Sequence, residues 1–216
     1  PFYAESGGQI GDTGTLTNTR GAVRVIDTKL ALDGLHVHET EDNELEIAVG
    51  DKLVVEIDVA RRMDIRRNHT ATHLLHSALR RVLGEHVKQQ GSWVGPDRLR
   101  FDFSHYAAVQ PEEIREIEDM VNMEVLNNLP CNHYETSKEK AEAAGAIAFF
   151  GDKYGDSVRV LEAGPSSIEL CGGTHVNALG DIGAFKIITE GSVGANIRRI
   201  EAITGPAPIN RLRDLE

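Results

Sequence analysis

Two short segments, far apart in the chain, carry side chains that bind transition metals. In His69-Thr-Ala-Thr-His73 the two histidines are four residues apart, so in a helix their imidazoles lie on the same face. About a hundred residues later, Cys171-Gly-Gly-Thr-His175 adds a thiol and a third imidazole. The first pair alone is better explained by ordinary, partly buried histidines. One cysteine and three histidines together form a natural zinc ligand set, and we predict that all four converge on one zinc site.

A helix from about Arg61 to Leu83 must position the first pair. Asp58 is a suitable N-cap and Gly84 a suitable C-terminal stop. One side of this predicted helix is apolar, which indicates that it packs on a core. The residues of that side are Ile65, Leu75, Leu79 and Val82.

The rest of the chain predicts an α+β fold. Residues 1–57 contain short apolar or alternating segments separated by turns, which favours a small N-terminal β-barrel. A mixed sheet-and-helix core with the zinc site is expected over 58–204, because its strands outnumber its helices and occur in runs. Residues 205–216 are expected to be a linker or the start of a further C-terminal region. The expected strands are 22–26, 35–38, 53–57, 87–93, 99–103, 146–150, 158–161, 167–170, 184–188 and 197–203, and the further helices begin at Pro111 and at Ser137.

The opening segment is rich in glycine. Between Tyr3 and Gly14 there are four glycines, including the adjacent Gly7 and Gly8 that precede Gln9. Glycine allows positive φ angles or the close approach of another chain segment. The spacing favours plain hairpin turns, and the lack of a strand followed by a helix argues against a nucleotide-binding loop.

Composition excludes several classes of protein. The 216 residues have ordinary hydrophobic (40%) and charged (26%) fractions, and no apolar run is long enough to cross a bilayer. Only two cysteines are present, so a disulfide framework is excluded and a cytoplasmic setting is expected. The chain lacks an initiator methionine and stops in a charged segment, which suggests a piece of a longer protein.

The net charge of −11 is unevenly distributed. Between positions 58 and 100, around the predicted metal site, the sequence contains nine basic residues and only four acidic ones. Positive charge placed there suits a phosphate-bearing substrate, although a solvated helix face explains it equally well. Arg62 and Arg66 share one face of the helix, and together with Lys88 they are the candidates for contacts with substrate phosphates. At least one arginine of the cluster formed by Arg61, Arg62, Arg66 and Arg67 is expected to be a surface residue or a buried ion-pair partner.

These motifs resemble the editing domain of alanyl-tRNA synthetase. The resemblance rests on His69-Thr-Ala-Thr-His73, on Glu169-Leu-Cys-Gly-Gly-Thr-His175 and on the glycine-rich opening from Phe2 to Gly14. It extends from Pro1 to about Gly205. Freestanding alanyl-tRNA editing proteins share the motifs, and the threonyl-tRNA synthetase editing domain is a more distant relative.

The resemblance implies a hydrolase that removes serine or glycine wrongly attached to alanine tRNA. A synthetic pocket sized for alanine cannot strongly exclude glycine, or a serine that adds only a hydroxyl, so a second site is needed. By the same resemblance Thr72 and Gln89 contact the amino acid, and Gln9 is a weaker candidate. Each of these side chains would otherwise be interpreted as bonding neighbouring backbone. Cys171 is expected to be essential, and the partners would be the acceptor end of tRNA(Ala) and the remainder of an ATP-binding synthetase in cis.

The role of zinc is open at this stage. The ion could polarise the ester carbonyl, activate water, or only position the terminal adenosine. Four protein ligands would close its coordination shell, whereas catalytic zinc normally keeps one position open. The glutamate of zinc peptidases is missing between His69 and His73, which excludes a metalloprotease. The alternative function is a tRNA-binding module with a structural zinc site and no turnover.

Overall fold

The first sheet is built from four antiparallel strands near the N-terminus. The computed structural model describes residues 1–216 except 33, 43–44, 46, 148–156 and 215–216. The strands are β1 (Gly14–Asn18), β2 (Gly21–Leu32), β3 (Leu35–Thr40) and β4 (Val54–Ile57), in the spatial order β3-β2-β1-β4. Its small core contains Phe2, Leu16, Val23 and Val25.

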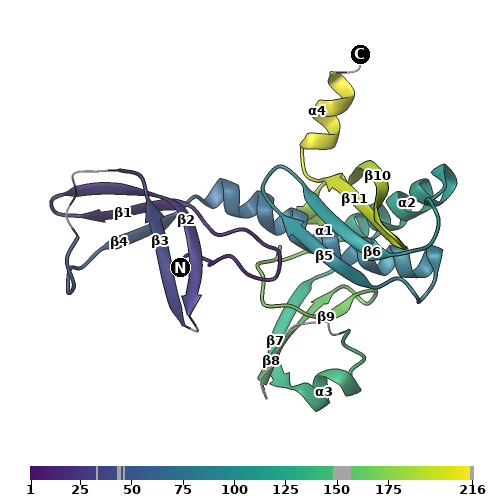
Figure 1. Ribbon diagram of the computed structural model, residues 1–216, viewed down its shortest axis with the longest axis horizontal. Coiled ribbons are helices and arrows are strands. Elements are labelled where there is room, and N and C mark those ends of the chain that lie inside the picture. The colour runs from purple at the N-terminus through teal and green to yellow at the C-terminus, as the bar shows by residue number, and fades with distance from the viewer. Residues whose placement is uncertain (33, 43–44, 46, 148–156, 215–216) are drawn as a thin grey trace.

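This sheet is the counterpart of the expected barrel. Among the described residues no pairing joins β3 to β4 into a closed ring. β1 pairs with the first half of β2, whereas β3 pairs with the second half. The end of β2 and β3 therefore extend past the sheet as a two-stranded ribbon (Figure 1), because twelve residues exceed what the five-residue β1 can pair.

Helix α1 (Val59–Leu83) is the central element. The Asp58 side chain accepts a hydrogen bond from the Arg61 amide, and Gly84 ends the helix with a φ of 115°. Both predicted boundaries are thus confirmed to within two residues. α1 runs from the first sheet toward the second half of the chain's fold, which contains β5 and β6 (Figure 1). All residues from Asn68 to Leu79 except Ser77 are buried.

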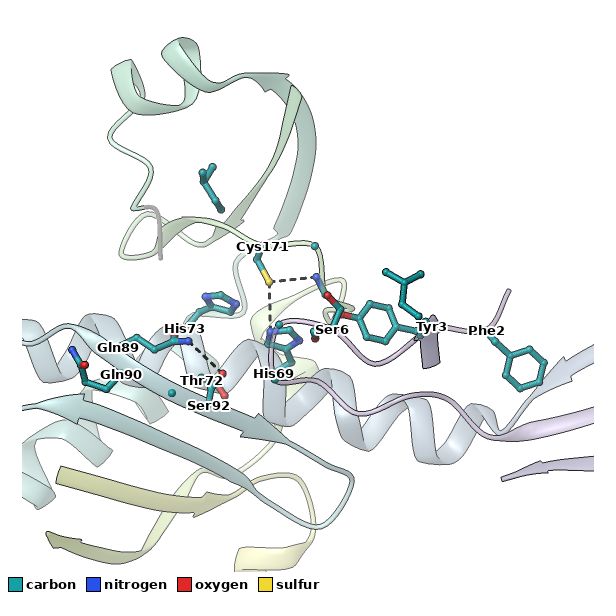
Figure 2. Close-up of a pocket in the computed structure, with 18 of the residues that line it drawn as sticks. Phe2, Tyr3, Ser6, His69, Thr72, His73, Gln89, Gln90, Ser92 and Cys171 are labelled. Carbon is teal, nitrogen blue, oxygen red and sulfur yellow. Dashed lines mark hydrogen bonds between the residues drawn. The ribbon is translucent and has the colours of Figure 1, made fainter. Parts of the chain in front are cut away.

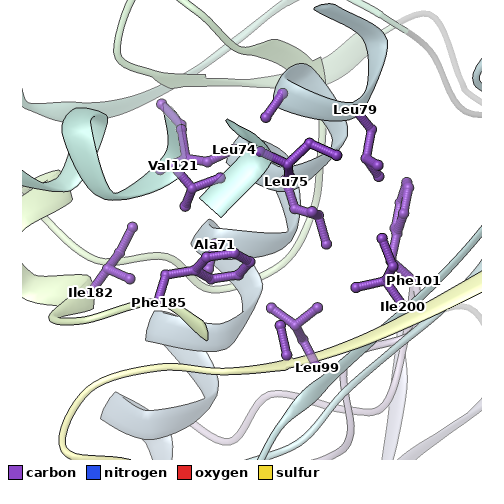
Figure 3. Packing of buried hydrophobic residues seen from close by; sticks show 14 of the residues in the cluster. Ala71, Leu74, Leu75, Leu79, Leu99, Phe101, Val121, Ile182, Phe185 and Ile200 are labelled. Carbon is purple, nitrogen blue, oxygen red and sulfur yellow. The ribbon is translucent and has the colours of Figure 1, made fainter. Parts of the chain in front are cut away.

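The main core lies between α1, a second sheet and helix α2 (Pro111–Asn127). The antiparallel sheet has the order β10-β11-β6-β5, formed by β10 (Lys186–Gly194), β11 (Ile197–Ile203), β6 (Leu99–Ser104) and β5 (Gln89–Val94). Leu75 and Leu79 of α1 face Phe101 and Ile200 of this sheet (Figure 3). Because β6 alternates buried and half-buried residues, it turns one face to α1, as period-two patterning requires.

A third, smaller sheet positions the second half of the metal motif. It has the order β7-β8-β9, formed by β7 (Cys131–Ser137), β8 (Ser157–Ala163) and β9 (Ile168–Leu170), with the short helix α3 (Lys138–Ala143) packed on it. β9 ends directly before Cys171, and the chain then passes the 3-10 helix η1 (Leu179–Ile182). The strand expected over 146–150 lies largely outside the described residues.

The C-terminal segment, expected to be a linker or the start of a further C-terminal region, contains a short helix. Helix α4 covers Ala207–Arg213 and projects away from the body of the molecule (Figure 1). Proline fits the first turn of a helix, where its missing N–H has no partner to lose, so Pro206 and Pro208 begin a helix here. Among the described helices, none combines the length and apolarity needed to span a membrane. The α+β class is confirmed; the division of the chain into domains stays a prediction.

Candidate metal centre

The four predicted ligands come together across the fold. His69 and His73 project from α1, while Cys171 and His175 come from the loop after β9. Their ligand atoms all lie within 4.8 Å of one another. The Cys171 sulfur lies 3.5 Å from His69 Nε2 and 3.3 Å from His175 Nε2. Zinc bond lengths at tetrahedral angles separate nitrogen and sulfur ligands by about 3.5 Å. The donor set and its spacing therefore fit a tetrahedral metal ion.

Glu169 orients one of these ligands from behind. This carboxylate is 1% exposed and accepts hydrogen bonds from the Nδ1 atoms of His73 and, at 2.9 Å, of His76. Because Nδ1 of His73 is directed outward, its Nε2 is the ring nitrogen left to face the metal position. Carboxylate–histidine pairs of this kind raise the basicity of a metal ligand and hold its ring.

Thr70 plays the corresponding part for His175. Its hydroxyl donates to the Arg66 carbonyl at 2.9 Å and lies 3.3 Å from His175 Nδ1. Because the Thr70 hydroxyl donates its proton to the Arg66 carbonyl oxygen, the contact with His175 must have Nδ1 as the donor and the Thr70 oxygen as the acceptor. The neutral ring then keeps a lone pair on Nε2, which is directed at Cys171.

Electrostatics favours a thiolate at this site. Burial opposes ionisation of the Cys171 thiol, but the surrounding imidazoles outweigh it and hold its pKa well below the usual value. Burial likewise opposes a charge on His73, yet Glu169 and Cys171 raise its pKa to about 10. Burial lowers the pKa of His175 to about 3. The raised pKa of His73 favours a proton on its ring in the metal-free protein, and metal binding would displace that proton.

The loop between the cysteine and the last histidine is held from outside. Nη1 of Arg159 in β8 donates to the carbonyl oxygens of Cys171, at 3.1 Å, and Gly173, at 2.6 Å. A Cβ atom on Gly173 would lie 2.0 Å from Cε1 of His69. The position accepts only glycine without rearrangement, because the loop backbone passes directly against a ligand ring.

A cavity of about 740 Å³ opens beside the metal position. Figure 2 shows Cys171 next to His69, with Tyr3 on one side and Gln89 on the other. His175 is not part of the wall, so only three of the four ligands border the cavity. Segments that are far apart in the sequence, from Phe2 to Gly173, meet in this wall. The lining residues outside the metal set are Phe2, Tyr3, Ala4, Ser6, Gly7, Gly8, Leu30, His36, Thr72, Gln89, Gln90, Gly91, Ser92, Leu170, Gly172 and Gly173.

The residues expected to contact the amino acid divide into two groups. Thr72 and Gln89 line the cavity, as do Gly7 and Gly8. The Thr72 hydroxyl donates to the Asn68 carbonyl at 2.8 Å. Gln9, in contrast, is fully buried behind the wall and bonds His69.

The three basic residues predicted to hold phosphates have different surroundings. The guanidinium of Arg62 is buried and paired with Asp12, with Nε 2.8 Å from Oδ1. It is thus the buried ion-pair partner expected within the cluster. Arg66 is half-buried, and none of the ion pairs found among the described residues involves it. Lys88 is exposed and directly precedes β5. Their roles in binding stay predictions.

Glu169, Thr70 and Arg159 are three contributors that were missed from the sequence. Glu169 lies inside the Glu-Leu-Cys-Gly-Gly-Thr-His motif, and an acid in an otherwise apolar strand was a usable signal for a buried partner. Arg159 carried no comparable signal, because its contact with the loop depends on the pairing of β8 with β9.

Comparisons with known proteins agree with the motifs. A family model described as "Threonyl and Alanyl tRNA synthetase second additional domain" matches residues 158–201, and one described as "tRNA synthetases class II (A)" matches residues 1–61. An alanine–tRNA ligase of Chloroflexus aurantiacus is 53% identical over 95% of this chain and 24% of its own length. Those of Acetivibrio thermocellus and Polynucleobacter asymbioticus are 50% and 52% identical over 100% of the chain.

The chain spans about a quarter of the length of these relatives. One family model covers the second half of the metal motif, and the other covers the glycine-rich opening and the start of α1. The comparisons therefore confirm that this chain is similar to a region of alanine–tRNA ligases along its whole length, which is consistent with the resemblance to their editing domain.

Proposed function

We propose that this chain hydrolyses the ester that links serine or glycine to the wrong tRNA, tRNA(Ala), as the proofreading part of an alanyl-tRNA synthetase. The observation that carries the proposal is the cavity, which brings three metal-ligand side chains into one wall with Thr72 and Gln89. An enzyme that selects alanine by size needs such a second site, because glycine is smaller and serine differs by one hydroxyl.

The size of the cavity supports an aminoacyl ester rather than a free amino acid. Its volume of about 740 Å³ lies within the range of sites that enclose drug-sized ligands. Serine alone would leave most of it filled with water. The 3′-terminal adenosine of the tRNA acceptor end, with the amino acid attached, matches this space better.

Thr72 supplies the chemistry for reading serine. Its hydroxyl proton is committed to the Asn68 carbonyl, so toward the cavity the oxygen acts as an acceptor. A seryl hydroxyl can donate to it, whereas an alanyl methyl group cannot. Gln89 donates from Nε2 to Ser92 Oγ at 3.3 Å, which leaves its amide oxygen as a second acceptor beside the cavity.

The metal proposed for the site is zinc, held by His69, His73, Cys171 and His175. A bound zinc ion supplies Lewis acidity next to the ester, or a fixed positive charge that orients the terminal nucleoside. The lowered pKa of Cys171 provides the thiolate that such a metal requires. His175 approaches from outside the cavity, so the substrate side of the site is bordered by His69, His73 and Cys171.

Phosphate contacts of the acceptor end are assigned to Arg66 and Lys88. Both belong to the basic residues between positions 58 and 100, around the metal motif. Phosphate contacts of this kind position a nucleic acid without reading its sequence. Arg62 is left out of this set, because its guanidinium is engaged by Asp12. The tRNA and the remainder of the synthetase are the partners that the proposal requires.

Deacylation of Ser-tRNA(Ala) by the isolated chain tests the proposal. We expect turnover by the zinc-loaded protein, and loss of turnover in Cys171→Ala, with Ala-tRNA(Ala) hydrolysed much more slowly. The alternative, a tRNA-binding module with a structural zinc, is favoured by the complete set of four ligands. It predicts tRNA binding without turnover, together with unfolding of the wild type when zinc is removed.

A further inference from the structure

Gln9, in the glycine-rich segment near the N-terminus of the chain, contacts the metal centre. Its side chain is 0% exposed, and its Oε1 lies 2.7 Å from Nδ1 of His69, sixty residues away in sequence. The same oxygen lies 2.9 Å from the Thr174 amide nitrogen and 3.2 Å from the Thr174 hydroxyl. One amide oxygen therefore connects the glycine-rich segment, α1 and the loop that carries Cys171.

The backbone contact fixes the direction of the histidine bond. An amide N–H can only donate, so the Gln9 atom facing Thr174 must be the oxygen. That oxygen can only accept, so the proton of the His69 contact must sit on Nδ1. A neutral His69 ring then carries its lone pair on Nε2, which is the atom 3.5 Å from Cys171.

The glycine-rich segment is shaped to deliver this side chain. Ser6 and Gln9 exchange backbone hydrogen bonds across Gly7 and Gly8, whose φ angles are 57° and 84°. Two successive positive φ angles make the two-residue hairpin turn for which Gly-Gly is preferred. The Gly8 carbonyl then accepts from the Val94 amide at 2.8 Å, which fixes the segment to the end of β5.

We propose that Gln9 is a positioning residue for the metal centre, holding His69 in the tautomer that presents Nε2 to the ion. The inference rests on the metal site of the proposed function, but not on its hydrolytic activity. It also explains why a glutamine that does not border the cavity follows the turn: the glycine-rich segment and the metal site are joined through its amide oxygen.

The test measures tautomer and metal affinity without any substrate. Gln9→Met removes the acceptor at similar side-chain volume, and Gln9→Glu keeps an oxygen in its place. The control is Gln90→Met, which replaces an exposed glutamine of the cavity wall. The ring tautomer of His69 is read from long-range ¹H–¹⁵N spectra of the metal-free protein, at a pH above the usual imidazole range. Zinc affinity is measured by competition with a chelator, and thermal denaturation of the metal-free protein reports the fold.

For Gln9→Met we expect a mixture of His69 tautomers and a roughly 10–100-fold loss of zinc affinity, with Gln90→Met unchanged. Gln9→Glu should restore both the tautomer and the affinity. An unchanged tautomer in Gln9→Met would overturn the proposal, as would an equal loss of affinity in Gln9→Met and Gln9→Glu. If the chain failed to deacylate Ser-tRNA but these results were obtained, the proposed function would fall and the role of Gln9 would stand.

Discussion

Replacing Arg62 with methionine would test whether this residue serves the fold or the substrate. The side chains of Arg62 and Asp12 are 9% and 2% exposed. Asp12 also accepts from the Tyr3 amide at 2.6 Å, and Arg62 donates to the Pro1 carbonyl at 3.0 Å. The pair thus ties the N-terminal segment, which forms part of the cavity wall, to the first turn of α1.

The expected cost follows from burial. Without Arg62 the Asp12 carboxylate stays buried with the Tyr3 amide as its remaining contact, and an uncompensated charge of this kind costs about 3–5 kcal/mol. For a chain of this size each kcal/mol lowers the melting temperature by roughly 2–4 °C. We therefore expect Arg62→Met to melt at least ~6 °C below the wild type. The double variant Asp12→Asn/Arg62→Met should recover part of the loss, because it removes the stranded charge as well.

Urea and thermal denaturation, followed by circular dichroism, measure the effect, with Arg66→Met as the matched control. Arg66 is on the same helix face, and none of the ion pairs found among the described residues includes it. Its replacement should change stability little and instead raise KM for Ser-tRNA with kcat retained. If Arg62→Met kept the wild-type melting temperature and raised KM, the assignment of Arg62 to the fold would be refuted.

Three further predictions concern the site and the pH dependence of stability. Gly173→Ala should lower zinc affinity by at least roughly tenfold, measured by chelator competition, because its Cβ would lie 2.0 Å from His69; an unchanged affinity would show that the loop has room to move. Thr72→Val should lower kcat/KM for Ser-tRNA by roughly tenfold without unfolding the chain; an equal loss on Gly-tRNA would argue against reading of the seryl hydroxyl. Burial, and to a smaller extent the neighbouring His86, lowers the pKa of His105. As the pH falls, this residue is therefore protonated in the unfolded chain before it is protonated in the folded chain, and stability falls below pH ~6.5. Urea denaturation of the metal-free protein at several pH values should show this slope, and His105→Gln should reduce it; an unchanged slope would exclude His105 as its source.

The ligands themselves could be found from the sequence, because their chemistry is local. Two histidines four residues apart share a helix face whatever surrounds them. Cys171 and His175 are close together in the chain, so any turn keeps them near each other. The ends of α1 were also predictable: Asp58 caps the helix through its own side chain, and Gly84 adopts a φ of 115° that few other residues tolerate.

The contacts that support the ligands were decided by the tertiary structure. Gln9 lies against His69 only because a hairpin turn and the end of β5 place it there, and no periodicity in the sequence links two residues that are sixty positions apart. Arg62 and Arg66 look alike in the sequence, since both are arginines on one helix face. Within the part of the chain that the structure describes, Arg62 forms a buried ion pair and Arg66 does not, because the N-terminal segment places Asp12 next to Arg62.

The C-terminal helix shows the same limit at the level of secondary structure. Two prolines in Gly205-Pro-Ala-Pro208 indicated a linker, yet proline is compatible with both a linker and the first turn of a helix. In the same way, the short strands near the N-terminus were recognisable, but the sequence could not distinguish the barrel expected from them from the open sheet of order β3-β2-β1-β4 that the described residues form. The sequence thus determined which side chains could bind a metal, because that is set by residue type and short-range spacing. The tertiary structure decided which residues hold those ligands in place, because such contacts join segments that only folding brings together.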